Sequence, residues 1–263
     1  MPTAIRDRLE SAIPSRARCL FLSPHLDDAV LSCGALMRAL APHCEVRVLT
    51  VFTETTPGPH TRAARSFLRQ CAHPDADTLF HARQAEDREV LDGLAVDHAH
   101  LGLPDALFRR REVPTAISRL GRLLPEVDHR YPTFRFDIAK GRVSRGDRPL
   151  AARLAGQVGD EIRDRGVDLV FCPLGVGRHV DHLLVRDLGA HHRERVVYYS
   201  DFPYNQSFAP DAAFVAGHGL RPWSFGDGID AKADMIRGYG TQADALFPSG
   251  RIPAVPETYF VGS

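Results

Sequence analysis

The chain has 263 residues, of which 44% are hydrophobic and 25% charged, as is typical of a globular protein with one large α/β domain or two small ones. Its 33 basic and 33 acidic side chains cancel, which excludes a general electrostatic attraction to nucleic acid or to an anionic membrane. The longest apolar runs fall well short of the roughly 18–20 residues that a transmembrane helix needs. We therefore expect no nucleic-acid partner and no transmembrane segment.

The N-terminus and the cysteines indicate a cytoplasmic protein. Charged residues interrupt the apolar content of residues 1–24, unlike in a secretory signal, and the spacing of Ile5, Leu9 and Ile13 predicts a short amphipathic helix. The five cysteines are odd in number and form no Cys-x-x-Cys pair, which favours reduced thiols.

The predicted elements alternate between strand and helix. In chain order they are a strand at 19–23, a helix at 28–41, a strand at 45–52, irregular turns at 53–61, a helix at 76–94, a strand at 98–104, helices at 114–124 and 150–164, a strand at 167–173, a loop at 175–182, a helix at 183–192, a strand at 195–203, and short strands with a helix at about 230–246. This order predicts an α/β fold with a Rossmann-like, mostly parallel sheet flanked by helices, and a smaller C-terminal portion of strands and helix.

Residues 126–149 interrupt this alternation. They are basic, rich in turn formers and weakly periodic, so we expect an insertion that forms a flap or mobile loop outside the core. The chain as a whole, residues 1–263, is expected to form a single domain that carries this flap.

Two predicted strands are followed by clusters of polar side chains. His25, Asp27 and Asp28 follow the strand at 19–23, and His179 and His182 follow the strand at 167–173. Ligands of a parallel sheet bind beyond the carboxyl ends of its strands, so the fold brings both clusters to one edge. One His, one Asp and a further His make the open three-ligand set of catalytic zinc.

The spare carboxylate, Asp27, is placed as a base for a water molecule, and the charge of a metal ion explains how two neighbouring carboxylates are tolerated. The alternative for Asp27 and Asp28 is a helix N-cap. The alternative for His179 and His182 is a solvated loop, since the chain has 13 histidines. The two clusters together, each after a strand, favour a metal site.

The motifs resemble those of the LmbE-like, or PIG-L, family of zinc-dependent N-deacetylases, which act on N-acetylglucosaminyl compounds. The segment Pro24-His25-Leu26-Asp27-Asp28-Ala29 matches the family's Pro/Ala-His-Pro-Asp-Asp-Glu, with Leu26 and Ala29 departing from it, and residues 179–182 match its His-x-Asp-His. Two weaker patterns of the family are partly matched. One includes Arg83, Glu86 and Gly93, and the other includes Lys232, Tyr239 and Gln242.

The resemblance implies a role for each motif residue. Zinc would be bound by His25, Asp28 and His182, and other divalent ions also suit such a site. Asp27 would act as the general base on the metal-bound water. His179 would stabilise the oxyanion and protonate the departing amine, and Asp181 would orient a histidine. Arg83 and Glu86 are interpreted as an exposed helix face or a structural ion pair.

The function implied is the removal of an N-acetyl or related acyl group from a small-molecule conjugate of N-acetylglucosamine or a similar amino sugar. The alternatives are an amidase of a thiol conjugate and a non-catalytic glycoconjugate-binding member of the same fold. The sequence Thr-Glu-Thr-Thr-Pro-Gly-Pro at 53–59 stands where the family has an Asp-Gly loop facing the substrate, so the sugar is left open. A homo-oligomer is also left open.

Overall fold

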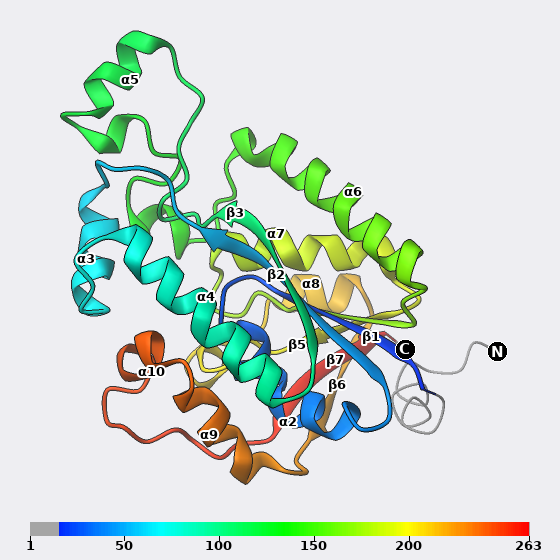
Figure 1. The fold of residues 1–263 in the computed structure, drawn as a ribbon. Helices are drawn as coiled ribbons and strands as arrows, with labels where there is room; N and C mark the ends of the chain where they lie inside the picture. The colour runs from blue at the N-terminus through cyan, green and yellow to red at the C-terminus, as the bar shows by residue number, and fades with distance from the viewer. Residues whose placement is uncertain (1–15, 263) are drawn as a thin grey trace.

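The computed structural model describes residues 16–262, so the helix predicted around Ile5–Ile13 lies outside the described residues. A seven-stranded sheet of order β3-β2-β1-β4-β5-β7-β6 runs through the molecule (Figure 1). The strands are β1 (Arg18–Ser23), β2 (Glu45–Glu54), β3 (Asp97–Pro104), β4 (Leu169–Pro173), β5 (Val196–Tyr199), β6 (Leu220–Phe225) and β7 (Glu257–Gly262). The first five strands pair in parallel, and β7 pairs antiparallel with β5 and β6.

Helices cover both faces of this sheet (Figure 1). They are α2 (Asp28–Leu40), α3 (Arg62–Gln70), α4 (Ala76–Gly93), α5 (Thr115–Gly121), α6 (Arg148–Arg165), α7 (Val180–Gly189), α8 (Ala212–Gly217), α9 (Lys232–Arg237) and α10 (Gly240–Leu246). One core cluster packs α2, α4 and α9 on one face, and a second packs α6, α7 and α8 on the other.

The alternation of side chains along β1 shows why its sequence is continuously apolar. Cys19 and Phe21 belong to the cluster under α2, whereas Leu20 and Leu22 belong to the cluster under α6 and α7. A strand buried on both faces needs apolar residues at every position rather than at alternate ones. The predicted α/β class, with a mostly parallel sheet between two helical layers, is confirmed.

The strand order decides where the two polar clusters meet. β1 lies in the centre of the sheet, between β2 and β4, so the loops after β1 and β4 leave the same edge side by side. From β1 the strands continue to β2 and β3 on one side and to β4 and β5 on the other. The point at which the strand order reverses is where open α/β sheets bind ligands.

Several boundaries differ from the predicted ones. Helix α7 begins at Val180, not at 183, because the ring of His179 caps it by accepting a hydrogen bond from the backbone N–H of Asp181. Helix α3 was not predicted, because only Ala64 and Leu68 are buried in an otherwise polar segment. The helix expected at 230–246 is two helices, α9 and α10, with a break at residues 238–239.

The segment 126–149 has no long element in this structure. It contains a π-helical turn at Phe134–Ile138 and is anchored by Tyr131 and Ile138, which are buried in a third cluster with Phe80 and Phe108. The flap and the single domain of residues 1–263 remain predictions. None of the helices within residues 16–262 combines the length and apolarity that a membrane crossing needs.

Candidate metal centre and active-site pocket

The turn between β1 and α2 is held by its own side chains. The hydroxyl of Ser23 donates to the carbonyl oxygen of His25 over 2.6 Å and accepts from the backbone N–H of Ala29 over 3.0 Å. Asp27 occupies the N-cap position of α2 but makes no capping hydrogen bond with its side chain. Helix capping therefore does not account for the Asp27 carboxylate, which lines a pocket instead.

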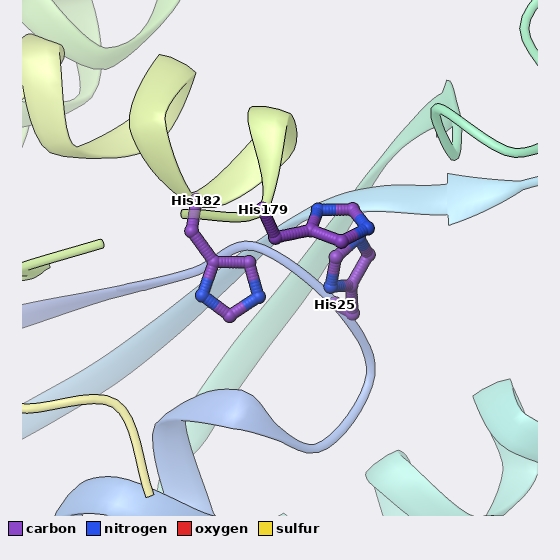
Figure 2. A group of neighbouring side chains, drawn as sticks. All are labelled: His25, His179 and His182. Atoms are coloured by element: carbon purple, nitrogen blue, oxygen red, sulfur yellow. The ribbon is translucent and has the colours of Figure 1, made fainter. Parts of the chain in front are cut away.

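The loop between β4 and α7 brings the second cluster to the same place. Gly175 and Gly177 have φ of +78° and +84°, a conformation that L side chains rarely adopt, so this tight loop depends on glycine. The loop ends at His179, the N-cap of α7, and His182 follows in the first turn of that helix. Figure 2 shows the rings of His25, His179 and His182 gathered together.

Asp28 lies between two of these histidines. Its Oδ2 is 3.0 Å from Nδ1 of His25 and 3.2 Å from Nε2 of His182. The outer nitrogen of each ring faces another carboxylate: Nε2 of His25 is 3.3 Å from Oδ2 of Asp181, and Nδ1 of His182 is 2.7 Å from Oδ1 of Asp201. An ionised carboxylate only accepts hydrogen bonds, so both outer nitrogens carry hydrogen.

When His25 and His182 are both neutral, the inner atoms of this group are all electron-pair donors. In a neutral histidine whose outer nitrogen is protonated, the inner nitrogen has a lone pair, and here both lone pairs face Asp28. A cation among the three groups removes the repulsion. Ligand atoms that share a tetrahedral zinc ion lie roughly 3.3 Å apart, close to the two distances from Asp28. The residues present therefore fit a metal ion held by His25, Asp28 and His182.

Two other groups of side chains could also hold a metal ion. The ring nitrogens of His25, His179 and His182 lie within 4.8 Å of one another, as do ligand atoms of His25, Asp105 and Asp181. The carboxylates behind His25 and His182 orient both rings toward Asp28, in the arrangement that ligating histidines usually show. We therefore favour the set that contains Asp28.

Electrostatics in the centre follow from these contacts. Burial lowers the pKa of His25, but the charge of Asp105 and the hydrogen bonds to Asp181 and Asp28 raise it to about 9. Burial likewise opposes charge on His182, yet Asp28 and Asp201 hold its pKa well above the usual value. The centre thus favours positive charge between its carboxylates, whether it comes from protons or from a metal ion.

Asp27 has a different environment from its neighbour. Burial and the charge of Asp28 raise the pKa of Asp27 to about 6, against the opposing effect of Arg83. The histidines, His182 foremost, outweigh burial at Asp28 and hold its pKa well below the usual value. Asp28 is therefore suited to binding a metal ion, and Asp27 is suited to exchanging a proton.

Of the two alternatives for Arg83, an exposed helix face or a structural ion pair, the exposed face is wrong. Arg83 is 4% exposed, lines the pocket, and places Nη2 3.6 Å from Oδ2 of Asp27. Its Nε is buried without a hydrogen-bond partner among residues 16–262. Glu86, on the same helix, accepts from the backbone N–H and the hydroxyl of Thr241 and so joins α4 to α10. Helical spacing alone does not tell which face of α4 is covered.

Asp181 and Asp201 complete the surroundings of the centre. Asp181 is fully buried and contacts His25, and its carboxylate also accepts from the guanidinium of Arg109 and the N–H of Ala106. The residue that contacts Nδ1 of His182 is Asp201, which sequence reasoning missed. The signal for it was an Asp two residues after Tyr199, where β5 ends at the same edge of the sheet.

The pocket in front of the centre has a volume of about 430 Å³. Its walls are largely apolar, and its polar groups gather at the metal centre, as in sites for small organic ligands. The lining residues are His25, Asp27, Asp28, Leu31, Ala63, Ser66, Phe67, Gln70, Arg83, Asp105, Leu107, Phe134, His179, Pro203, Tyr204, Gln242, Ala245 and Leu246. Asp181 and His182 lie outside this lining.

Comparisons with known proteins agree with the geometry. The family model of PIG-L, GlcNAc-PI de-N-acetylase, matches residues 20–192. The chain is 30% identical over 252 residues to the 2'-N-acetylparomamine deacetylase of Streptomyces fradiae, covering 91% of this chain and 77% of that protein.

Solved structures show the same fold. A deacetylase of teicoplanin biosynthesis matches with a TM-score of 0.70 and 25% identity over 93% of this chain and 97% of that one. The deacetylase of A40926 pseudoaglycone matches with a TM-score of 0.67 and 23% identity over 94% and 97%. The matched family model and the Streptomyces fradiae relative confirm the resemblance read from the sequence: the chain belongs to the PIG-L family.

Proposed function

We propose that the protein is a zinc-dependent hydrolase that removes an N-acetyl or related acyl group from an amino sugar conjugate. One structural observation carries the proposal: Oδ2 of Asp28 lies between Nδ1 of His25 and Nε2 of His182. The neighbouring Asp27 makes no capping hydrogen bond and lines the pocket. Membership of the family supports the reaction class, and the Streptomyces fradiae relative, a 2'-N-acetylparomamine deacetylase, supports the substrate class.

His25, Asp28 and His182 would hold the ion, and the bound ion would acidify a water molecule and polarise the amide carbonyl. Asp27, ionised in the resting enzyme, takes a proton from the attacking water. The water oxygen bonds to the carbonyl carbon, the carbon–nitrogen bond breaks, and the amine leaves with a proton while the acyl group leaves as a carboxylate. A carboxyl group with a pKa raised to about 6 is suited to accept and return a proton near neutral pH.

His179 stabilises the oxygen of the reacting carbonyl. Its Nδ1 accepts from the backbone N–H of Asp181, so in the neutral ring the hydrogen is on Nε2. Burial holds the pKa of His179 well below its usual value, which favours this neutral form. We therefore assign His179 to hydrogen bonding with the developing oxyanion, and we assign delivery of the proton to the amine to Asp27.

Arg83 and the apolar walls bind the remainder of the substrate. Arg83 lines the pocket beside Asp27, and its guanidinium offers several N–H donors to the hydroxyl groups of a sugar. Phe67, Phe134 and Tyr204 supply apolar and aromatic surface along the same pocket, suited to the faces of a sugar ring.

The test combines metal analysis with product analysis. We expect about one zinc ion per purified chain, and loss of that zinc when His25 and His182 are both replaced by alanine. With a panel of N-acetylglucosaminides and related N-acyl amino sugars, we expect release of the carboxylate and a free amine, identified by mass spectrometry. A protein that binds no zinc, or that retains zinc after both replacements, contradicts the proposal. Cleavage confined to thiol conjugates would favour the amidase alternative.

A further inference from the structure

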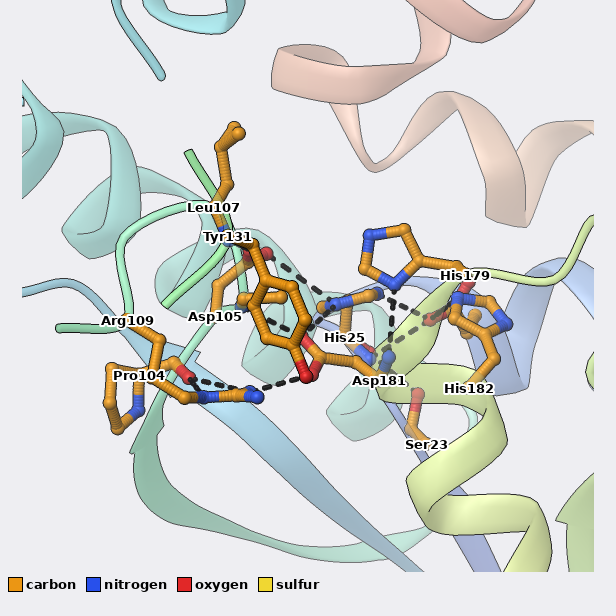
Figure 3. Close-up of polar contacts among 12 residues, drawn as sticks. Ser23, His25, Pro104, Asp105, Leu107, Arg109, Tyr131, His179, Asp181 and His182 are labelled. Atoms are coloured by element: carbon orange, nitrogen blue, oxygen red, sulfur yellow. Dashed lines mark hydrogen bonds and ion pairs between the residues drawn. The ribbon is translucent and has the colours of Figure 1, made fainter. Parts of the chain in front are cut away.

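A chain of buried charged groups extends from His25 into the protein (Figure 3). Asp181 contacts His25, Arg109 contacts Asp181, and Asp147 contacts Arg109 on its other side. The hydroxyl of Tyr131 donates to the same carboxylate of Asp147 over 2.6 Å. Each of these residues is buried, so the contacts are little weakened by solvent.

Arg109 is fixed at every part of its guanidinium. Nη2 is 2.6 Å from Oδ1 of Asp181, and Nη1 is 2.9 Å from Oδ2 of Asp147. Nε and Nη2 also donate to the carbonyl oxygen of Pro104, over 3.2 and 3.0 Å, and the group lies 4.6 Å from the centre of the Phe52 ring. Only a planar group with several donors can make these contacts together, so a lysine cannot replace it without loss.

Asp181 transmits this constraint to the metal centre. Its Oδ1 accepts from Arg109, while its Oδ2 accepts from the N–H of Ala106 over 2.8 Å and from Nε2 of His25 over 3.3 Å. The carboxylate therefore has one orientation. Together with Oδ2 of Asp105, which is 3.4 Å from the same Nε2, it turns the ring of His25 so that Nδ1 faces Asp28. The hydrogen bond from Arg109 to Oδ1 of Asp181 therefore also fixes the position of Oδ2.

The far end of the chain of contacts lies in the insertion. Asp147, Tyr131 and Ser144 all belong to residues 126–149, and Tyr131 accepts from the backbone N–H of Ser144 over 2.9 Å. Arg130, from the same segment, pairs with Oδ1 of Asp147 over 3.3 Å. The insertion is thus joined to His25 through two charged residues, Arg109 and Asp181.

We propose that Arg109 is a positioning residue for the metal centre, which orients His25 through Asp181 and makes metal affinity depend on the contacts that hold Arg109 at Asp147. The inference rests on the proposed function, because it takes His25 as a metal ligand. Arg109 does not line the pocket, so it acts through Asp181 and not on the substrate.

The experiment measures zinc affinity of metal-free protein by competition with a chelator, beside thermal unfolding of the same protein. Arg109→Lys keeps the charge but cannot bridge both carboxylates, and we expect zinc to bind about 10- to 100-fold more weakly. In a double-mutant cycle, Arg109→Lys should add little to the loss caused by Asp181→Asn, because both act on one contact.

A neighbouring arginine provides the matched control. Arg110 also bridges a buried carboxylate of the insertion, Asp128, and two backbone carbonyls, but it has no contact with Asp181. Arg110→Lys should lower the melting temperature and leave zinc affinity unchanged. If Arg109→Lys does not fold, Tyr131→Phe, which removes one hydrogen bond to Asp147, should weaken zinc binding about 2- to 10-fold.

Two results would overturn the inference. The first is unchanged zinc affinity in folded Arg109→Lys or, if that variant does not fold, in Tyr131→Phe. The second is an equal loss of zinc affinity in Arg109→Lys and Arg110→Lys. Absence of zinc binding by the wild-type protein would instead contradict the proposed function. The affinity measurement needs no substrate, so the two failures are distinguished.

Discussion

Oδ2 of Asp28 lies 3.2 Å from Nε2 of His182, although the two residues begin different helices, α2 and α7. His182 directs its other nitrogen to Asp201, so in the neutral ring the nitrogen that faces Asp28 has a lone pair. The contact then needs a positive charge between the two atoms, either a proton on Nε2 or a metal cation. The following predictions test what that positive charge is and what surrounds it.

Asp27 and Asp28 should respond differently to replacement by alanine. Asp28→Ala removes a ligand, so zinc content of the purified protein should fall together with activity. Asp27→Ala should retain zinc but lose about 10²- to 10⁴-fold in kcat, because the group that exchanges the proton is gone. Metal analysis and initial rates on the same samples check both statements, with Asp27→Asn as the variant of matched size. Full turnover by Asp27→Ala would show that another group is the base.

His179→Ala separates the two sets of ligands that the histidines could form. If zinc is held by His25, Asp28 and His182, this variant should bind zinc with unchanged affinity and lose about 10²- to 10³-fold in kcat through the missing hydrogen bond to the oxyanion. Chelator competition gives the affinity, and steady-state kinetics at saturating zinc give kcat. A large drop in zinc affinity would place His179 among the ligands.

Asp201→Asn should weaken zinc binding about 10- to 100-fold, because the residue that fixes the ring of His182 loses its charge. The amide also places a donor near the backbone N–H of Val176, which now donates to Asp201 over 2.8 Å. Zinc affinity is again the measurement. Asp234→Asn, at an exposed carboxylate paired with Arg237, is the control and should bind zinc as the wild type does.

Arg83→Met should raise KM for an amino sugar substrate about 10- to 100-fold, because a guanidinium that lines the pocket is lost. Arg83→Lys, which keeps the charge but offers fewer N–H donors, should show an intermediate KM. Zinc content should not change in either variant. A KM equal to that of the wild type in Arg83→Met would exclude a substrate contact for this residue.

Much of the fold and of the candidate site could be predicted because the evidence was local. Continuous apolar runs marked the strands at 19–23 and 167–173. His25 and Asp28 come directly after the first strand, and His182 follows the loop after the second. The rule that parallel strands present their carboxyl ends at one edge then joined the two clusters without any coordinates. The start of α7 was misplaced by three residues, because a histidine is an uncommon N-cap and gives no signal in the sequence.

The sequence by itself determined the alternation of elements, the two motifs and the family. Only the tertiary structure decided which groups contact the candidate ligands. Asp201 contacts His182, His25 is the histidine that Asp181 contacts, Arg109 contacts Asp181, and Arg83 lies beside Asp27. These partners come from elements far apart in the chain, and a buried charge is stable only where a partner of opposite charge reaches it. That condition depends on packing of the whole sheet and its helices, which no local pattern of residues contains.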